Sequence, residues 1–354
     1  MISVLVADDS FFMRKLISDI LNADPGIEVV GAAADGEQAV AMAKKLRPDV
    51  ITMDLDMPKM NGLEATKILM AEENIRPIVV MVSAFTKEKA AETLECLHAG
   101  AFSCIMKPSG PVSVNIETVE KDLIAQVKAA AKSKGTALGL SKVRRAAPMR
   151  TLKQKDGKFP LIVIGASTGG PPVLEELFSQ LQSHIDAAVL IVQHMPASFT
   201  ASLAERLDKI SPIKVKQAEQ GEIIKPGTAL VAPGNEHMLL ERRKEGKDVN
   251  YLIRLTKEAP VHGLRPSIDV LMHSVAASFQ GKVLAILLTG MGEDGKIGMK
   301  EIKESGGHTI VQDPATCIVD SMVDSVIEED CADEILPPDA IATRIDAFSP
   351  AVLT

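Results

Sequence analysis

The chain has 354 residues, of which 46% are hydrophobic and 24% are charged, and its formal net charge is -8. This length suits two domains of ordinary size, each able to bury its own core. The acidic balance argues against binding to nucleic acid or to an anionic membrane surface, because phosphate groups are bound by concentrated basic surfaces. The four cysteines match neither a zinc pattern nor a dense disulfide framework.

The N-terminal sequence gives an indication of where in the cell the protein is located. It becomes acidic at Asp8 and Asp9, where a signal peptide would need an apolar core. The longest apolar runs, such as Val283 to Leu288, are far shorter than the roughly 20 residues of a membrane-spanning helix. We therefore expect a cytoplasmic protein with no direct insertion into a membrane.

Residues 1–128 are expected to form the first domain. Their short apolar runs alternate with amphipathic stretches, and the runs lie near 2–7, 27–32, 49–53, 77–82 and 102–106. This alternation predicts a five-stranded parallel sheet that is wound on both sides by helices. Residues 129–158 are rich in Ala, Lys and Gly and are predicted to form a linker.

Acidic residues follow the first and third predicted strands. Asp8 and Asp9 end the first strand and Asp54 ends the third, while Ser83 and Lys107 end the fourth and fifth. A parallel sheet brings these strand ends to one edge, where three carboxylates would repel one another unless they held a hard cation such as Mg²⁺. Taken singly, each position has a simpler explanation, since acids often cap helices and a Lys-Pro pair often begins a loop.

The combination is more specific than its parts. Asp8-Asp9, Thr52-Met53-Asp54, Asp56-Met57-Pro58, Asn61-Gly62, Ser83 and Lys107-Pro108 together resemble the response-regulator receiver family over about the first 125 residues. The resemblance implies a flavodoxin-like fold, phosphorylation of Asp54 by a histidine kinase, Mg²⁺ held by Asp8, Asp9 and Asp54, and phosphoryl sensing by Ser83 and Lys107. Cys104 stands where receivers usually carry an aromatic residue, which questions the usual aromatic switch but not phosphorylation.

Residues 159–350 are expected to form the second domain. Apolar runs at 159–164, 188–192 and 283–288 are typical of buried parallel strands. The stretches 237–243 and 249–255 suit a hairpin. We therefore expect a doubly wound, mainly parallel α/β domain with an added antiparallel hairpin.

The strongest candidate for a catalytic motif in this domain is Gly165-Ala166-Ser167-Thr168-Gly169-Gly170-Pro171-Pro172, which follows a predicted strand and precedes a helical pattern. A glycine-rich turn of this kind projects a serine hydroxyl above the sheet edge. A phosphate-binding loop is a weaker alternative, because the dinucleotide glycine spacing and the P-loop lysine are absent. Ser167 could also merely cap the helix.

Two further strand ends carry the residues that a serine nucleophile needs. Gln193-His194-Met195-Pro196 follows one strand, and Thr289-Gly290-Met291-Gly292-Glu293-Asp294-Gly295 follows another. A serine hydroxyl is a weak nucleophile, so it needs a histidine to take its proton and a carboxylate to hold that histidine. Ser167, His194 and Asp294 could supply these roles.

These motifs, with Arg265-Pro266-Ser267-Ile268-Asp269, resemble the catalytic domain of the chemotaxis protein-glutamate methylesterase family. The resemblance implies that Ser167 attacks methylated glutamates of methyl-accepting chemoreceptors, with release of methanol, and that glutamine is deamidated by the same chemistry. It further implies an oxyanion hole of the Thr168 and Met291 amides, no cofactor for hydrolysis, and activation by receiver phosphorylation. The Arg265–Asp269 segment could contact substrate, and the start of a helix on Pro266 explains it at least as well.

One segment departs from this family. Where the family usually has an aromatic residue followed by Gly-Met-Pro, this chain has Val319-Asp320-Ser321-Met322-Val323. Asp320 could therefore alter which receptor glutamates are accepted. Two alternatives stay open: a phosphorylation-dependent receptor-binding protein with weakened catalysis, and a DNA-binding response regulator, for which a basic C-terminal domain is lacking.

Overall fold

A computed structural model describes residues 1–72, 75, 77–83, 87–107, 116–133, 159–181, 185–246 and 248–348. The chain divides into two compact units, residues 1–137 and 138–354, and each is described by itself. Most of the predicted linker, residues 134–158, lies outside the described residues. Among those described, no helix combines the length and the apolar character needed to cross a membrane.

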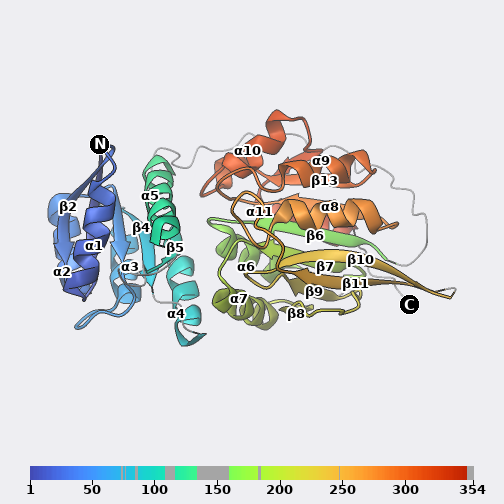
Figure 1. The fold of residues 1–354 in the computed structure, drawn as a ribbon, viewed down its shortest axis with the longest axis horizontal. Coiled ribbons are helices and arrows are strands. Elements are labelled where there is room, and N and C mark those ends of the chain that lie inside the picture. Colours follow the sequence, from blue (N-terminus) through green and yellow to red (C-terminus); the bar gives the residue numbers. More distant parts are fainter. Residues whose placement is uncertain are drawn as a thin grey trace. The chain divides into compact units, whose positions relative to one another are not determined.

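The first unit contains a five-stranded parallel sheet of order β2-β1-β3-β4-β5 (Figure 1). Its strands are β1 (Ile2–Ala7), β2 (Ile27–Ala33), β3 (Val50–Met53), β4 (Ile78–Ser83) and β5 (Ser103–Met106). Its helices are α1 (Phe11–Asn22), α2 (Gly36–Leu46), α3 (Gly62–Ala71), α4 (Lys87–His98) and α5 (Ile116–Ser133). Because β2 lies on one side of β1 and β3 to β5 lie on the other, crossovers of the usual right-handed kind place helices on both faces of the sheet. The predicted doubly wound, flavodoxin-like fold is confirmed.

The second unit is built on a seven-stranded parallel sheet of order β14-β13-β12-β6-β7-β9-β8. Its strands are β6 (Leu161–Ala166), β7 (Ala188–Gln193), β8 (Lys214–Gln217), β9 (Thr228–Val231), β12 (Val283–Leu287), β13 (His308–Gln312) and β14 (Glu334–Leu336). A separate antiparallel hairpin pairs β10 (His237–Glu245) with β11 (Asp248–Thr256). The predicted mainly parallel α/β domain with an antiparallel hairpin is therefore confirmed.

Helices cover this sheet on both sides (Figure 1). They are α6 (Gly170–Gln180), α7 (Ala197–Ile210), α8 (Ile268–Ser278), α9 (Lys296–Glu304), α10 (Ser321–Glu328) and α11 (Pro338–Phe348), with a 3-10 turn at Pro314–Thr316. α6 packs against α7 and α11, whereas α8 packs against α9 and α9 against α10. Every residue of the central strand β6 is buried, which explains its uninterrupted apolar sequence.

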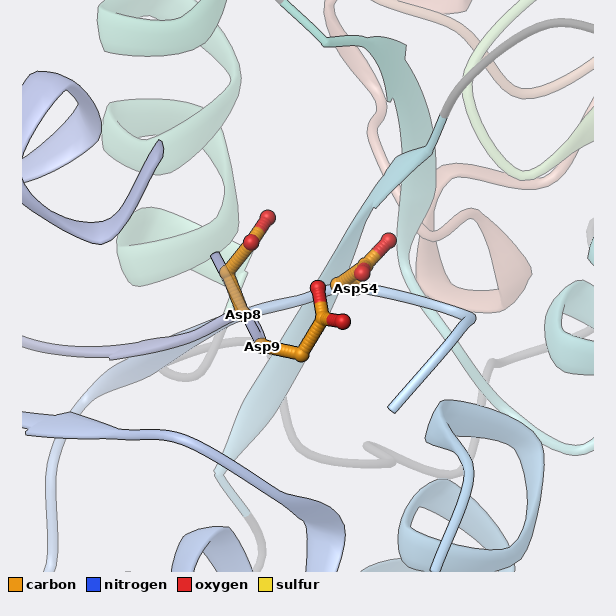
Figure 2. A group of neighbouring side chains, drawn as sticks. All are labelled: Asp8, Asp9 and Asp54. Carbon is orange, nitrogen blue, oxygen red and sulfur yellow. The ribbon is translucent and has the colours of Figure 1, made fainter. Parts of the chain in front are cut away.

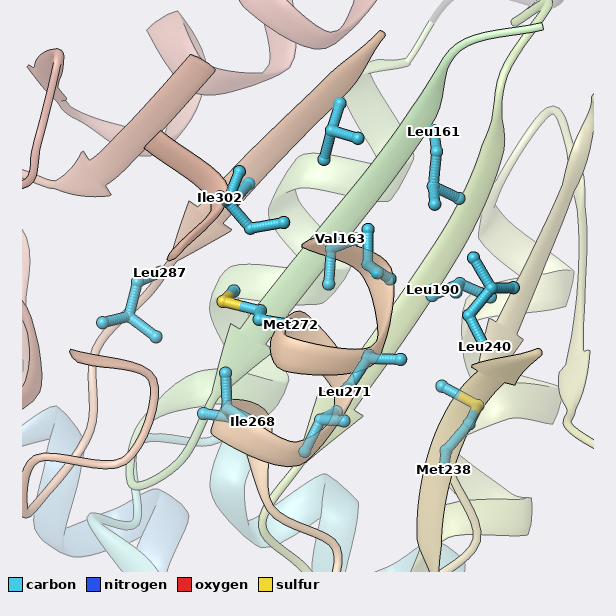
Figure 3. Packing of buried hydrophobic residues seen from close by; sticks show 14 of the residues in the cluster. Leu161, Val163, Leu190, Met238, Leu240, Ile268, Leu271, Met272, Leu287 and Ile302 are labelled. Atoms are coloured by element: carbon cyan, nitrogen blue, oxygen red, sulfur yellow. The ribbon is translucent and has the colours of Figure 1, made fainter. Parts of the chain in front are cut away.

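Helix α8 lies directly on the sheet and sets the geometry of its edge. Figure 3 shows Ile268, Leu271 and Met272 of α8 in the same hydrophobic cluster as Val163 of β6, and all four are fully buried. Fully burying a side chain of this size stabilises the fold by about 1.5–3 kcal/mol. The two elements approach closely at Gly165, where a Cβ would lie 2.6 Å from Ile268 Cγ2, so the first turn of α8 abuts the end of β6.

Candidate functional site

Each sheet has a point where the strand order reverses, and such switch points are where open α/β sheets place their sites. In the first unit this point lies between β1 and β3. Asp8 and Asp9 directly follow β1 and Asp54 directly follows β3. Their carboxylates gather at this edge, with ligand oxygens within 4.8 Å of one another (Figure 2). Carboxylate oxygens at this spacing suit a hard cation such as Mg²⁺.

A lysine completes this acidic group. Lys107 Nζ lies 2.7 Å from Asp8 Oδ2 and 2.9 Å from Asp54 Oδ2. Burial raises the pKa of Asp54 to about 6, although the hydrogen bond and charge of Lys107 act against the rise. Burial would lower the pKa of Lys107, but its bonds with Asp54 and Asp8 outweigh burial and raise it. The hydroxyl-bearing Ser83 is buried at the end of β4, and its carbonyl accepts from the Lys107 amide at 3.0 Å.

Local contacts hold the acidic turn in place. Arg14 donates from Nη1 to the carbonyls of Asp8 at 2.7 Å and Asp9 at 2.9 Å. Ser10 begins α1 by accepting from the Met13 amide, so the helix starts immediately after the acidic pair. The chain therefore turns away from the sheet and leaves the carboxylates at the strand end.

In the second unit the strand order reverses between β6 and β12. Ser167 directly follows β6, and its amide donates to the Thr289 carbonyl at 3.1 Å. The N-cap of α6 is Gly169, with φ of 80° and no side-chain cap, so Ser167 does not cap this helix. The alternative of a mere helix cap is wrong, and the side chain of Ser167 is half-buried at the sheet edge.

His194 follows the neighbouring strand β7 and is paired with a carboxylate. Its amide donates to the Ala166 carbonyl at 3.0 Å, and its Nε2 lies 2.7 Å from Asp294 Oδ2. The two side chains are 6% and 0% exposed. His194 Nδ1 is buried and has no partner among the described residues. Nε2 is therefore occupied by Asp294, and Nδ1 is the ring nitrogen available to another group.

The loop after β12 carries Asp294 and also borders Ser167. A Cβ on Gly290 would lie only 2.7 Å from Ser167 Cβ, so this loop packs against the serine. Within the described part of the chain, the amides of Thr168 and Met291 make no hydrogen bond. Both amides are therefore available as donors on the two segments that meet at Ser167.

Asp294 is ionised by its surroundings. Burial alone would raise its pKa, but the hydrogen bond and charge of His194 and the amides of Ile268 and Asp269 outweigh burial and lower the pKa to about 2. The adjacent Asp269 is affected in the opposite direction, because burial raises its pKa to about 6. Two neighbouring carboxyl groups with pKa values pushed apart are typical of sites that perform acid–base chemistry.

The sequence interpretation missed what holds Asp294. The Arg265–Asp269 pattern predicts a possible helix start on Pro266, whereas α8 begins at Ile268 and its N-cap is Ser267. The Ser267 hydroxyl donates to Asp294 Oδ1 at 2.8 Å, and the Ile268 amide donates to Oδ2 at 2.7 Å. No local pattern reveals these contacts, because a serine before a helix looks the same whether or not it also binds a distant carboxylate.

Comparisons with known proteins identify the family. Residues 162–345 match the family model of the CheB methylesterase, and residues 4–116 match the response regulator receiver domain. The protein-glutamate methylesterase/protein-glutamine glutaminase of Pyrococcus horikoshii is 42% identical over 346 residues, which cover 97% of this chain and 92% of that protein. The chain belongs to the CheB methylesterase family.

Other CheB methylesterase relatives are equally extensive. The protein of the same name from Halalkalibacterium halodurans is 44% identical over 347 residues, which cover 97% of each chain. The crystal structure of the Thermotoga maritima CheB methylesterase catalytic domain has a TM-score of 0.50 and 40% identity, and covers 52% of this chain and 96% of that one. Because these relatives are named as enzymes, the alternative of a receptor-binding protein with weakened catalysis is not favoured.

The segment that departs from the usual CheB methylesterase sequence is anchored to the loop beside Ser167. Gly290 donates to the Val319 carbonyl at 2.9 Å, and the Met322 amide donates to the Gly290 carbonyl at 3.2 Å. Ser321 Oγ accepts from the Gly292 amide at 3.1 Å. Asp320 precedes α10 and does not cap it with its side chain. The substituted residues thus support the site with main-chain bonds and with the Ser321 hydroxyl.

Proposed function

We propose that this chain is a protein-glutamate methylesterase, and also a protein-glutamine glutaminase, that acts on methyl-accepting chemoreceptors in the cytoplasm. The single observation that carries the proposal is the buried His194–Asp294 pair beside the Ser167 turn, in a chain of the CheB methylesterase family. This arrangement suits acyl transfer by a serine nucleophile. The proposed substrate is a methyl-esterified glutamate side chain of the receptor.

Ser167 is the proposed nucleophile and His194 the proposed base. As Ser167 Oγ attacks the γ-carbonyl carbon of the methyl ester, its proton passes to His194 Nδ1, because Nε2 is held by Asp294. Asp294 keeps the proton of the neutral ring on Nε2 and stabilises the imidazolium that forms. The contact of Nε2 with Asp294 and the lack of a partner for Nδ1 among the described residues support this assignment.

The amides of Thr168 and Met291 are proposed to bind the oxyanion of the tetrahedral intermediate, since both are available donors beside Ser167. The protonated His194 then gives its proton to the departing oxygen, and methanol leaves. Water attacks the acyl-enzyme with His194 again as base, and glutamate is released as Ser167 regains its proton. On glutamine the same sequence releases ammonia.

The first unit is proposed to control this chemistry. Asp54 would accept a phosphoryl group from the histidine kinase of the chemotaxis system, and Lys107 and Ser83 would contact its oxygens. Asp8, Asp9 and Asp54 would hold Mg²⁺, which when bound offsets the negative charge of the carboxylates and the phosphoryl group. We propose a receiver domain at 1–128, a linker at 129–158 whose first residues, up to Ser133, continue α5, and a catalytic domain at 159–350.

The test is methanol release from methylated receptor membranes by the full chain, with and without a small phosphodonor. Ser167→Ala should abolish release, whereas Ser179→Ala, which changes an exposed hydroxyl on α6 that bonds the Glu176 carbonyl, should retain it. Full activity of Ser167→Ala would disprove the nucleophile assignment.

A second comparison tests the control by the receiver. Asp54→Asn should remove the stimulation by the phosphodonor and leave basal release measurable. Asp24→Asn, which loses only an ion pair with Lys128, is the matched control and should still respond. A phosphodonor that stimulates Asp54→Asn as strongly as the wild type would show that Asp54 is not the acceptor.

A further inference from the structure

The N-terminus of helix α8 binds the Asp294 carboxylate by hydrogen bonds. Oδ1 accepts from the Ser267 hydroxyl at 2.8 Å and from the Asp269 amide at 3.0 Å. Oδ2 accepts from the Ile268 amide at 2.7 Å and faces His194 Nε2 at the same distance. Three donors of one helix start therefore engage a carboxylate that comes from the loop after β12, and the positive end of the helix favours its charge.

These contacts fix the orientation of the carboxylate as well as its charge. The terminal torsion of an aspartate is broad and roughly two-fold, so packing at Cβ does not by itself decide where each oxygen points. Of the two oxygens, only Oδ2 can face His194 while Oδ1 is held by Ser267. A donor on Oδ1 is thus a means of aiming Oδ2 at the imidazole.

Burial and a backbone hydrogen bond fix the position of Ser267. It is fully buried, and its amide donates to His237 Nδ1 at 3.2 Å. His237 is in turn 1% exposed, and its Nε2 lies 3.1 Å from the Ala259 carbonyl. A neutral His237 that accepts at Nδ1 and donates at Nε2 satisfies both contacts. The backbone of Ser267 is therefore fixed, and its single hydroxyl proton points to Asp294.

We infer that Ser267 is a positioning residue of the hydrolytic site, which acts through Asp294 to orient the His194 imidazole. This inference rests on the proposed function of Ser167, His194 and Asp294. Ser267 touches none of the reacting atoms. Its contribution is to the rate of proton transfer after substrate has bound, so its loss should lower kcat and leave KM unchanged.

A purely structural role for Ser267 is the competing explanation, because its hydroxyl also accepts from the Val270 amide at 3.4 Å as the cap of α8. Loss of a cap destabilises the fold but does not reach the imidazole of a folded molecule. Ser274 provides a matched control on the same helix. It is also buried, and its hydroxyl accepts from the Leu240 amide at 2.9 Å and donates to the Leu271 carbonyl at 2.7 Å, remote from Asp294.

The experiment compares Ser267→Ala, Ser267→Thr and Ser274→Ala in the full chain. A serine-directed fluorophosphonate probe reports how fast Ser167 reacts without any receptor, and methanol release from methylated receptor membranes gives kcat and KM. The free energy of a hydrogen bond to a charged group is equivalent to a factor of about ten to a hundred in rate. Ser267→Ala should therefore slow labelling and lower kcat by about that factor. Ser267→Thr keeps a hydroxyl and should recover most of the rate, while Ser274→Ala should label normally.

Two further measurements keep the test decisive. The downfield proton resonance of His194 Nε2–H should shift in folded Ser267→Ala and stay in place in Ser274→Ala. If Ser267→Ala does not fold, Ser267→Cys, which has a similar shape but a weak donor, should show the same rate loss. A folded Ser267 variant without the hydroxyl that labels at the wild-type rate would overturn the inference. Failure of the wild type to release methanol, or full activity of Ser167→Ala, would instead overturn the proposed function.

Discussion

Replacing Gly290 by alanine should disable the site through a single methyl group. The added Cβ would lie 2.1 Å from Met322 Sδ and 2.7 Å from Ser167 Cβ. Met322 is fully buried, so its side chain cannot turn out into solvent to relieve this contact. The methyl group would therefore push on the loop after β12 and on the nucleophile itself.

The expected magnitude follows from these distances. Non-bonded carbon atoms in contact are normally about 3.5–4.0 Å apart, so Ser167 Cβ and the Gly290 backbone must separate by about 1 Å. A displacement of that size at a reacting group can lower the rate about a hundredfold. Overpacking of a filled interior typically costs about 1–3 kcal/mol, and each kcal/mol lowers Tm by about 2–4 °C in a domain of this size.

The assay pairs fluorophosphonate labelling of Ser167 with thermal unfolding. Gly281→Ala is the matched control, because its Cβ would lie 2.7 Å from Phe279 Cε1, yet Gly281 precedes β12 at the opposite end of the strand from Ser167. Gly290→Ala should lose both stability and labelling rate, and Gly281→Ala should lose stability alone. A Gly290→Ala protein that labels at the wild-type rate would refute the reasoning.

Three further predictions concern the acidic side chains. Asp294→Asn should lower kcat by about 10³–10⁴-fold, the effect of the equivalent change in Ser-His-Asp proteases, because a neutral amide cannot stabilise the His194 imidazolium; a loss below tenfold would contradict this role. Burial raises the pKa of Asp269 to about 6 from an unfolded value near 4, so its contribution to stability is present below pH 4 and lost as the pH rises through 6. Asp269→Asn should therefore gain on the order of 1–2 kcal/mol relative to the wild type between pH 4 and pH 7, measured by denaturant unfolding, and a difference independent of pH would disprove the shift. Asp8→Asn should raise the Mg²⁺ concentration needed for phosphorylation by a small phosphodonor, since one of three carboxylates is lost, and an unchanged Mg²⁺ dependence would exclude it as a ligand.

Much of the fold could be predicted because its buried strands are marked by local apolar runs in the sequence. The five strands of the first unit and β6, β7 and β12 of the second agree with the apolar runs to within about two residues. A parallel strand that is buried on both faces needs a continuous apolar run, and such a run is visible without knowledge of any partner. The order of the strands also brings Asp8 and Asp54, and the turns of Ser167 and His194, to shared edges, as their positions after strands predicted.

Four strands of the second sheet, β8, β9, β13 and β14, were not predicted. β13 shows why: it is fully buried, yet it contains His308, Thr309 and Gln312. His308 is paired with Glu334 at 2.7 Å, and Thr309 Oγ1 donates to the Cys331 carbonyl at 2.7 Å. His308 and Thr309 can be buried because partners more than 20 residues away satisfy them, and the sequence pattern does not show those partners.

The sequence by itself therefore determined which side chains could perform the chemistry, because a nucleophile, a base and a carboxylate after apolar strands are local features. Only the tertiary structure decided how they are connected. It assigned Nε2 of His194 to Asp294, and it placed the Ser267 hydroxyl on the other oxygen of that carboxylate. The physical reason is that a hydrogen bond is sensitive to its angle and to differences of a few tenths of an ångström in its length. The packing of α8 against β6 sets this geometry, and the spacing of residues in the sequence does not encode it.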